Sequence, residues 1–330
     1  MSDVAGIDVA ARKLDVARLS ETGSVQLRQF EQSPAGHQKL VAYLRKHKVE
    51  AVVMEATGIY YLDAAVALYN AGIPISVINP RAAHHFAKVM LQSSKTDRID
   101  AQLLAEYARR MTLKPWRAPN EDWLALRDIA RRINQLTGMR TAEKNRLHAL
   151  QAQQHTRKTM IDELLAHIEQ LEHSIERLTK AAVDVIGQDP VLARYDACLT
   201  SATGIARASA VALLGELCLL PTQLRSSQVS RQAGLDVRLT ESGSSIDQPG
   251  RLSKAGNTYL RAGLYMPSLS LVRHDPRAKA HYNALVARGK KKMQALCAVQ
   301  RKMLTGLWAC MHANEPFDSA KLFAIEPDQA

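Results

Sequence analysis

The order of strand and helix signals in the first hundred residues limits the fold more than any other feature of this sequence. Three short runs with strand character come first, and a turn at Glu21-Thr22-Gly23 separates the second from the third. A helix is expected next, because a capping serine followed by proline favours a helix start. The expected elements are strands at 4–9, 14–19 and 25–30, a helix from Ser33-Pro34, a strand at 51–54, a helix at 60–69 and a strand at 75–78.

Three strands followed by helix, strand, helix and strand predict an α/β sheet of mixed direction. This order is that of the RNase H/RuvC-like fold. A doubly wound dinucleotide-binding fold is disfavoured, because its glycine fingerprint is missing after the first strand. We therefore expect an RNase H/RuvC-like domain over residues 1–115.

The middle of the chain carries a heptad pattern. Apolar residues recur at spacings of three and four over 126–136, and a strict a/d repeat runs for three heptads from Ile161 to Ala182. A polar break at 151–155 would let two helices fold back as an antiparallel pair. The stripe is explained either by such a hairpin within one chain or by dimerisation. We assign residues 116–190 to coiled-coil helices.

Positive charge is concentrated towards the C-terminus. The chain has 44 Lys and Arg against 32 Asp and Glu, and within 251–302 twelve basic residues accompany one acid, Asp275. Such an excess indicates a polyanionic partner, of which nucleic acid is the commonest, although a merely soluble basic surface is the alternative. We place this block in a mostly helical domain over 191–330. The residues expected to contact nucleic acid are Arg238, Arg251, Lys254, Arg261, Lys290, Lys291 and Lys292.

The cysteines and the hydropathy exclude several other classes. The four cysteines show no CxxC pairing and no zinc-ligand spacing, which favours free buried thiols in a reducing compartment. No stretch approaches 18 uninterrupted apolar residues, and the N-terminus carries no basic-plus-apolar signal. The sequence thus predicts a soluble intracellular protein with no membrane partner.

Four carboxylates stand where an RNase H-like fold places metal ligands. Asp8 lies in the first strand, Glu55 ends the fourth, and Asp97 and Asp100 share one face at the start of a helix over 97–110. Clustered carboxylates repel each other unless divalent cations neutralise them, and hard oxygen ligands favour Mg²⁺ or Mn²⁺. Two such ions would activate a nucleophile and stabilise the leaving oxygen in phosphoryl transfer.

Each carboxylate also has an ordinary structural explanation. Asp8 would cap a turn, Asp97 would serve as a helix cap, and Asp100 would be a favourable acid in the first turn. Glu55 would pair with a Lys or Arg. Asp15 and Asp63 are rivals, on a hairpin strand and on a helix surface. The joint position of the four in the predicted topology favours the metal site.

A loop of small polar residues at 241–245 supplies candidate nucleophiles. A serine in such a loop is most often a linker residue, but Arg238, Arg251 and Lys254 flank it and would orient a phosphate. No Ser-His-Asp arrangement is legible nearby. A serine attacking DNA phosphorus would therefore need activation by a metal or by arginines.

A series of short motifs resembles the DEDD transposases of bacterial insertion-sequence family 110, including its 1111 subgroup. The similarity spans about residues 4–320. The motifs are, in order, Gly6-Ile7-Asp8, Met54-Glu55-Ala56-Thr57-Gly58, Val77-Ile78-Asn79-Pro80, Lys95-Thr96-Asp97-Arg98-Ile99-Asp100-Ala101, Glu241-Ser242-Gly243-Ser244-Ser245, Ser253-Lys254-Ala255-Gly256-Asn257 and Leu264-Tyr265-Met266-Pro267.

The resemblance implies a RuvC-like domain, a coiled-coil segment and a C-terminal transposase domain. It implies that Asp8, Glu55, Asp97 and Asp100 form a Mg²⁺-binding tetrad and that Ser242 is a nucleophile forming a phosphoserine link to DNA. The implied partners are donor and target DNA and an element-encoded bridge RNA. Family members form dimers that pair into tetramers, with composite sites made from one protomer's tetrad and another's serine. The resemblance also implies a location in the bacterial cytoplasm, at the nucleoid.

Two other functions stay open, and one motif departs from the family. The rival enzyme is a RuvC-like DNA endonuclease that uses activated water and forms no covalent intermediate. The third reading is a non-catalytic nucleic-acid-binding scaffold. Where family members often carry Pro-Gly-Ile-Gly, this chain has Thr203-Gly204-Ile205-Ala206, so a phosphate-holding role for that turn is in doubt.

Overall fold

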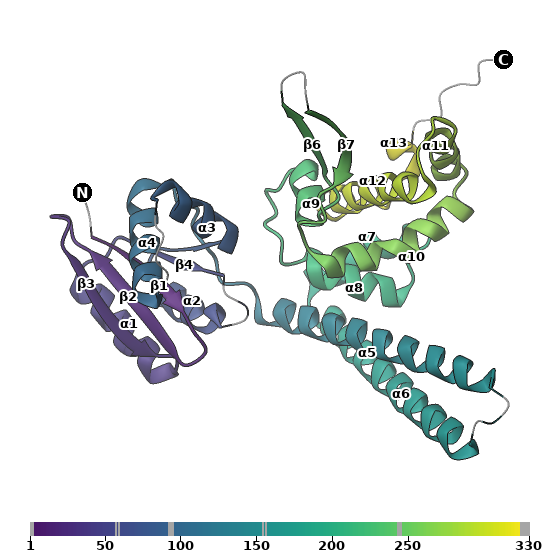
Figure 1. Ribbon diagram of the computed structural model, residues 1–330, viewed down its shortest axis with the longest axis horizontal. Coiled ribbons are helices and arrows are strands. Elements are labelled where there is room, and N and C mark those ends of the chain that lie inside the picture. The colour runs from purple at the N-terminus through teal and green to yellow at the C-terminus, as the bar shows by residue number, and fades with distance from the viewer. Residues whose placement is uncertain are drawn as a thin grey trace. The chain divides into compact units, whose positions relative to one another are not determined.

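The computed structural model describes residues 3–56, 58, 60–91, 96–153, 155, 157–242 and 246–323, and of residues 239–242 and 246–249 the backbone alone. The chain divides into two compact units, residues 1–118 and 119–330. Each unit has its own hydrophobic core and is described by itself (Figure 1).

Unit 1 contains the mixed sheet that the order of signals predicts. The strand order is β3-β2-β1-β4-β5, with antiparallel β1–β2 and β2–β3 pairs and parallel β1–β4 and β4–β5 pairs. This order fits the RNase H/RuvC-like fold. The elements are β1 (Val4–Val9), β2 (Lys13–Leu19), β3 (Val25–Glu31), α1 (Pro34–Lys46), β4 (Ala51–Glu55), α2 (Tyr61–Asn70), β5 (Ile75–Ile78), α3 (Pro80–Val89) and α4 (Asp97–Arg110).

Local capping explains where the helices of unit 1 begin. The Ser33 hydroxyl accepts a hydrogen bond from the Gly36 amide, and proline occupies the first turn of α1, as the sequence predicts. The expected element order omits α3. Its start has the same chemistry, because the Asn79 side chain accepts a hydrogen bond from the Arg81 amide ahead of a proline.

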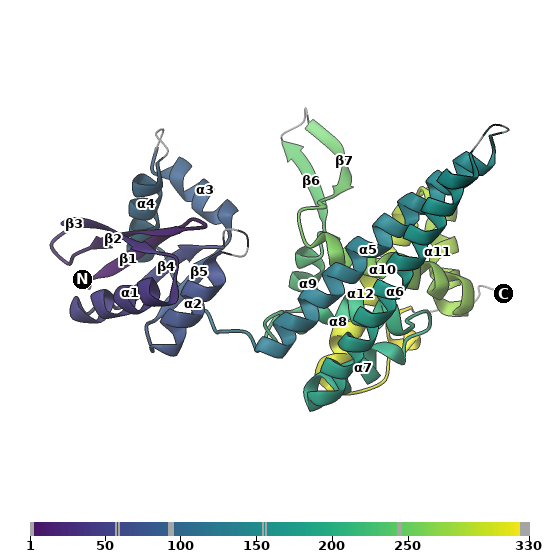
Figure 2. The same cartoon turned by 90° about the horizontal axis from the view of Figure 1, so that it is seen from below.

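Helices cover both faces of the sheet. Apolar residues of α1 and α2 pack on one face with Ile7 and Met54, and residues of α3 and α4 pack on the other with Val4 and Val53. Figure 2 shows the two helix pairs on opposite sides of the strands. The alternation of side chains along each strand therefore separates two apolar layers.

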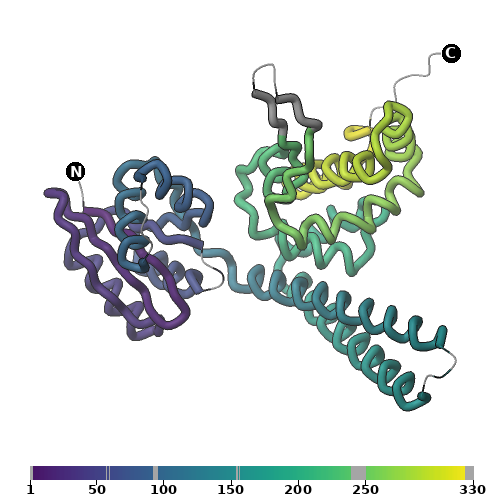
Figure 3. The backbone as a smooth tube through the Cα atoms, viewed as in Figure 1, coloured from purple at the N-terminus to yellow at the C-terminus, as the bar shows by residue number. Residues whose placement is uncertain are grey.

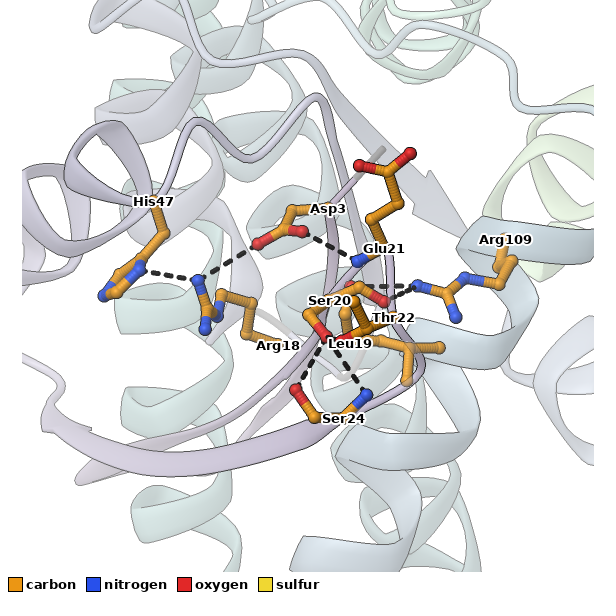
Figure 4. Close-up of polar contacts among 9 residues, drawn as sticks. All are labelled: Asp3, Arg18, Leu19, Ser20, Glu21, Thr22, Ser24, His47 and Arg109. Atoms are coloured by element: carbon orange, nitrogen blue, oxygen red, sulfur yellow. Dashed lines mark hydrogen bonds and ion pairs between the residues drawn. The ribbon is translucent and has the colours of Figure 1, made fainter. Parts of the chain in front are cut away.

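Two contacts hold α4 against the centre of the sheet. A Cβ atom at Gly6 would lie 2.2 Å from the Ala101 carbonyl oxygen, so only glycine lets β1 approach this helix so closely. At the other end of α4, the Arg109 guanidinium donates to the carbonyl oxygens of Leu19 and Ser20, at 3.0 and 2.6 Å (Figure 4). These contacts fix α4 along β1 and β2.

The edge of the sheet at the start of β1 carries a separate polar network. Arg18 lies between Asp3, 3.0 Å away, and the His47 Nδ1 atom, 2.5 Å away, and the Glu21 amide donates to Asp3 (Figure 4). These contacts link the segment before β1 to β2 and to the end of α1, although the Nε atom of Arg18 is buried without a hydrogen-bond partner. The network therefore has a structural role.

Unit 2 is mostly helical with one hairpin. Its elements are α5 (Glu121–Gln151), α6 (Lys158–Gln188), α7 (Pro190–Thr200), α8 (Arg207–Leu217), α9 (Ser226–Gln232), β6 (Val237–Ser242), β7 (Ile246–Leu252), α10 (Thr258–His274), α11 (Pro276–Ala287), α12 (Lys292–Ala313) and α13 (Ser319–Leu322).

The heptad stripe is buried within the chain. Helix α6 runs back along α5 as an antiparallel hairpin (Figure 3), and Leu164, Ile168 and Leu171 of the stripe are buried. The Lys144 ammonium lies 2.7 Å from Glu172 across the two helices. Of the two explanations for the stripe, the helical hairpin is present; dimerisation through it stays a prediction.

The two long helices also share a core with the helices that follow them. Leu126 and Ile133 of α5 and Ala182 and Ile186 of α6 join one apolar cluster with residues of α7, α8, α10 and α12. The expected division of this region at residue 190 stays a prediction.

The region around the serine loop forms a hairpin rather than a simple loop. Strands β6 and β7 pair antiparallel, with Arg238 opposite Arg251 and Ser242 opposite Ile246. The segment after β7 is held by backbone hydrogen bonds from Ser253 to Asp236 and from Asn257 to Gln232. These bonds anchor the base of the hairpin to the end of α9.

The structure bears on two further expectations, that the thiols are free and that the chain has no membrane-spanning helix. All four cysteines are free, and burial raises the pKa of Cys218 to about 12, so this thiol is inert. Within the described ranges, no helix combines the length and apolar character needed to cross a bilayer.

Candidate metal centre

The register of the sheet brings three carboxylates to one edge. Asp8 in β1 lies opposite Asp15 in β2. In the parallel ladder Ile7 lies beside Met54, so Asp8 and Glu55 follow together at the carboxyl ends of β1 and β4. Because side chains alternate between faces, all three carboxylates belong to the face that α4 covers.

Helix α4 adds two more carboxylates at its first turn. The Thr96 hydroxyl caps the helix by accepting a hydrogen bond from the Ile99 amide, 3.3 Å away. Asp97 and Asp100 follow, three residues apart and on one face, where the positive end of the helix dipole favours acids. The helix begins where the sequence predicts it, but its cap is Thr96 and not Asp97.

The predicted ligands gather around Asp8. Carboxylate oxygens of Asp8, Asp15 and Asp97 lie within 4.8 Å of one another. Burial, followed by the negative charges of Asp100, Asp97, Glu55 and Asp15, raises the pKa of Asp8 from 3.8 to about 6. The structure thus brings together the four carboxylates that the sequence singles out, although their role as ligands stays a prediction.

One cation lies inside the cluster. The Lys13 ammonium is 2.6 Å from Asp97 and 2.9 Å from Asp15. The hydrogen bond from Lys13 is the main reason that the pKa of Asp97 falls below its ordinary value. The Gln29 amide donates to the other oxygen of Asp15, 2.9 Å away.

The chemistry of these residues fits a divalent cation. A half-buried group of five carboxylates with one ammonium keeps a net negative charge that is costly in a low dielectric. Carboxylate oxygens are hard ligands, which suits Mg²⁺, Mn²⁺ or Ca²⁺ rather than softer metals. The arrangement therefore provides for divalent-metal chemistry on a phosphate.

Sequence reasoning set Asp15 aside because it lies on a hairpin strand. Its side chain is only 9% exposed, and its carboxylate belongs to the same cluster as that of Asp8. The antiparallel register places it there. A signal that would have found it is the pairing of the first two strands, in which the two aspartates face each other.

Comparison with known proteins places the chain in a family. A model of the DEDD transposase of IS110, described as "Transposase", matches residues 5–156, and one described as "Transposase IS116/IS110/IS902 family" matches residues 196–283. The chain belongs to the IS110 family of transposases. It is a DNA transposase/recombinase, as the resemblance implies.

Individual relatives extend over nearly the whole chain. The pilin gene-inverting protein of Moraxella bovis is 26% identical over 323 residues, which cover 95% of this chain and 97% of that protein. The corresponding protein of Moraxella lacunata matches to the same extent. An insertion element IS110 protein of Streptomyces coelicolor is 27% identical over 131 residues, 39% of this chain and 31% of that protein.

Among solved structures, Thermus thermophilus RuvC in complex with a Holliday junction substrate is 20% identical, with a TM-score of 0.28. The match covers 35% of this chain and 100% of that chain.

Several of the predicted nucleic-acid residues of this IS110-family chain are exposed. Arg238 and Arg251 face each other across the hairpin, and Lys254 follows β7 with a positive φ of 50°. Lys290, Lys291 and Lys292 are exposed where α12 begins. Arg261 differs, because its guanidinium donates to the Ala233 carbonyl oxygen, 2.8 Å away.

Other parts of the family motifs have structural roles. Asn257 caps α10 by accepting hydrogen bonds from the Tyr259 and Leu260 amides. The turn glycine Gly204 lies against α10, since a Cβ atom there would be 2.7 Å from the Pro267 carbonyl oxygen. Close packing therefore accounts for that glycine without a bound phosphate.

The backbone of Ser242 ends β6 opposite Ile246. Its side chain, and the neighbouring residues Ser244 and Ser245, lie outside what the structure describes. The assignment of the serine nucleophile stays a prediction from the family motif.

Proposed function

We propose that this transposase is a Mg²⁺-dependent, RNA-guided DNA recombinase that excises and inserts its own insertion sequence, with Ser242 as the nucleophile. The observation that carries the proposal is the convergence of carboxylates on Asp8. Burial and four neighbouring negative charges raise the pKa of that residue to about 6. Such a cluster is costly to fold and is typical of a site that handles phosphates through a metal.

Within this proposal, Asp8, Glu55, Asp97 and Asp100 hold the metal. A bound divalent ion supplies charge neutralisation at the scissile phosphate and stabilisation of the leaving oxygen. Asp15, placed by its register with Asp8 and by its hydrogen bond from Gln29, adds a fifth negative charge to the site.

The serine step exchanges one phosphate ester bond for another. The Ser242 hydroxyl oxygen attacks the DNA phosphorus and loses its proton, and the bond between phosphorus and one neighbouring sugar oxygen breaks. That sugar oxygen leaves as a hydroxyl after gaining a proton. The energy of the broken ester is kept in the phosphoserine, which allows a second DNA end to be joined without an external energy source.

Positive charge on unit 2 that forms no ion pair within the described side chains supports a DNA partner. Arg238 and Arg251 face each other across a hairpin, and like charges at that spacing repel unless an anion lies between them. Lys290, Lys291 and Lys292 stand at the start of α12, where cations oppose the helix dipole. A phosphate backbone would relieve both repulsions.

Guidance by a bridge RNA and assembly into dimers and tetramers follow from the family resemblance. The chain has no zinc finger, no convincing helix-turn-helix and no RNA-recognition sheet motif. Base pairing to an element-encoded RNA accounts for target choice without them. In the proposed assembly one protomer supplies the carboxylates and another supplies the serine.

A specific observation favours a second candidate, a RuvC-like endonuclease that uses activated water. All five carboxylates come from residues 8–100, within unit 1. A site of this composition needs no residue from the hairpin to cleave DNA.

A covalent-adduct assay tests the proposal. Full-length protein, RNA transcribed from the flank of the element, labelled donor and target DNA and Mg²⁺ are combined and run on a denaturing gel. We expect a protein–DNA adduct that disappears in Ser242→Ala and in Asp8→Ala, and that requires the RNA. Ser244→Ala and Ser245→Ala are the matched controls and should keep the adduct.

The alternatives give different gels. Cleavage without any adduct, unchanged in Ser242→Ala, would identify the water-dependent endonuclease. An adduct lost in one of the control variants but kept in Ser242→Ala would move the nucleophile to the other serine. Binding without cleavage in wild type and in Asp8→Ala alike would leave a non-catalytic scaffold.

A further inference from the structure

One stretch of unit 1 contains no acidic residue. Between Asp63 and Asp97, residues 64–96 include neither Asp nor Glu. Helix α3 lies in this stretch, and its Arg81, His84, His85 and Lys88 have the spacing i, i+3, i+4 and i+7. That spacing places all four on one side of a helix.

The packing of α3 decides which side faces solvent. Ala83 and Phe86 are buried, and the Phe86 ring meets the Tyr107 ring of α4 edge-on, with centroids 5.1 Å apart. The opposite side of the helix, which carries the four basic residues, is exposed. We call Arg81, His84, His85 and Lys88 the α3 basic face.

No carboxylate neutralises this face within the described ranges. The side chains of Arg81 and Lys88 form no ion pair there, and the ring contact between His84 and His85 joins two members of the face to each other. By contrast, Lys13 pairs with Asp97, Arg18 with Asp3 and Arg110 with Glu106. The α3 basic face therefore presents uncompensated charge.

The helix starts at the edge of the sheet that carries the carboxylates. Ile78, the last residue of β5, pairs with Glu55 at the end of β4, and the Ala56 amide donates to its carbonyl oxygen, 3.0 Å away. Asn79 follows and caps α3 through the Arg81 amide. Only two residues thus separate Arg81 from the strand that borders the metal centre.

We propose that the α3 basic face binds the phosphate backbone of the DNA strand whose scissile phosphate lies at the carboxylates around Asp8. Arg81 and Lys88 are seven residues apart, about 10 Å along the helix axis. The two cations can therefore each meet a different phosphate of one strand, whose phosphates rise about 3.4 Å apart along the duplex axis. The face attracts a polyanion, which the acidic metal centre by itself would repel.

The inference rests on the proposed function in one respect, that the strand at the carboxylates is DNA. Continuity with the metal centre favours DNA over RNA as the occupant, because the nucleic acid that is cut must reach both. A guide RNA has no need to approach the carboxylates.

Salt-dependent binding of a double variant tests the inference. Arg81→Gln/Lys88→Gln in the full chain is titrated with a labelled 30-base-pair DNA duplex in EDTA, at several salt concentrations. Each lost phosphate contact lowers the slope of log affinity against log salt by about 0.9. We expect a slope smaller by about two and, at fixed low salt, DNA affinity lower by at least tenfold.

The chain offers a matched control on the opposite face of the sheet. Lys39 and Lys46 of α1 are exposed and also seven residues apart. Lys39→Gln/Lys46→Gln changes the net charge by the same amount, so it reproduces any long-range field effect. This control should keep the wild-type slope. Unchanged melting temperatures would show that both double variants fold.

Three results would overturn the inference. The first is a wild-type slope in Arg81→Gln/Lys88→Gln, and the second is an equal loss in both double variants. The third is an intact DNA affinity with lost affinity for the RNA from the flank of the element, which would assign the face to RNA. The binding assay needs no cleavage, so failure of the proposed chemistry would appear separately, as absence of cleavage by wild type in Mg²⁺.

Discussion

The Lys13 ammonium lies 2.6 Å from a carboxylate oxygen of Asp97, joining the start of β2 to the start of α4. The same ammonium lies 2.9 Å from Asp15. Lys13 therefore occupies the region between two carboxylates of the metal centre and offsets part of their charge. A divalent ion binding to these oxygens competes with it.

Removing this internal cation should strengthen metal binding. We expect Lys13→Gln to lower the Mn²⁺ concentration needed for half-maximal thermal stabilisation by about two- to fivefold, since solvent screens this exposed ion pair and limits the gain. Melting curves of the full chain over a Mn²⁺ titration measure this. Lys39→Gln, an exposed lysine on α1, should leave the midpoint unchanged. A higher midpoint in Lys13→Gln would show that Lys13 supports the metal instead of competing with it.

The charge of Asp8 should destabilise the metal-free protein. Its pKa is raised from 3.8 to about 6 by burial and by neighbouring carboxylates. The folded state therefore binds the proton more tightly than the unfolded state, so the stability from protonated Asp8 is present below pH 4 and lost as pH rises through about 6. The full shift corresponds to about 3 kcal/mol, and solvent screening of this half-buried group reduces it to about 1–2 kcal/mol.

Replacing this carboxylate should remove the pH dependence. In EDTA, Asp8→Asn should be more stable than wild type at pH 7 and no more stable at pH 4, as measured by hydrogen exchange of β1 and α4. Mg²⁺ should stabilise wild type more than the variant. Glu50→Gln, an exposed carboxylate before β4, serves as the control and should show no such gain. Equal stability of Asp8→Asn and wild type at pH 7 would contradict the claim that the charge of Asp8 destabilises the metal-free protein.

The close approach of β1 and α4 should make position 6 intolerant of any side chain. In Gly6→Ala the new Cβ would lie 2.2 Å from backbone atoms of Ala101 and Ala105, so the helix must shift. Overpacking of this kind costs about 1–3 kcal/mol or more. Faster hydrogen exchange in β1 and α4 and lost Mg²⁺-dependent cleavage should follow.

A second glycine supplies the opposite outcome. Gly138 lies inside α5, where an added Cβ atom would meet no described atom within 4 Å apart from the helix's own backbone. Gly138→Ala should therefore stabilise the helix, by up to about 1 kcal/mol. Similar behaviour of the two variants would mean that the contact at Gly6 does not position α4.

An ion pair with a buried carboxylate links the helical hairpin of α5 and α6 to α8. Glu216 of α8 accepts from the Arg131 guanidinium of α5 at 2.6 and 3.0 Å, and from the Asn257 amide at 2.5 Å. Its side chain is 4% exposed. Glu216→Gln removes the carboxylate that faces the Arg131 charge. Because the Arg131 side chain is 35% exposed, water screens part of the loss, and we expect a cost of about 1–2 kcal/mol.

Thermal unfolding of unit 2 measures this loss. Glu172→Gln removes a carboxylate that pairs with Lys144 across the same hairpin, but on an exposed surface. Because solvent screens this pair, Glu172→Gln should unfold close to the wild-type temperature. A loss as small in Glu216→Gln would show that the hairpin is held by apolar packing alone.

Local patterns in the sequence determined the strands of unit 1, the start of α4 and the choice of candidate metal ligands. The order of strands in unit 1 follows from alternating apolar runs and turn residues, and α4 begins at Asp97 because Thr96 caps it. The choice of Asp8, Glu55, Asp97 and Asp100 needs only the strand ends and one helix start. Such features depend on neighbours within a few residues, which the sequence displays directly.

Tertiary structure alone decided the rest. Antiparallel register brought Asp15 to Asp8, and packing brought Lys13 to Asp97, 84 residues away. Packing of Phe86 against Tyr107 leaves the basic side of α3 exposed to solvent. The heptad stripe of α6 packs against α5 of the same chain. These outcomes depend on which surfaces meet across long stretches of chain, and no local pattern records that choice.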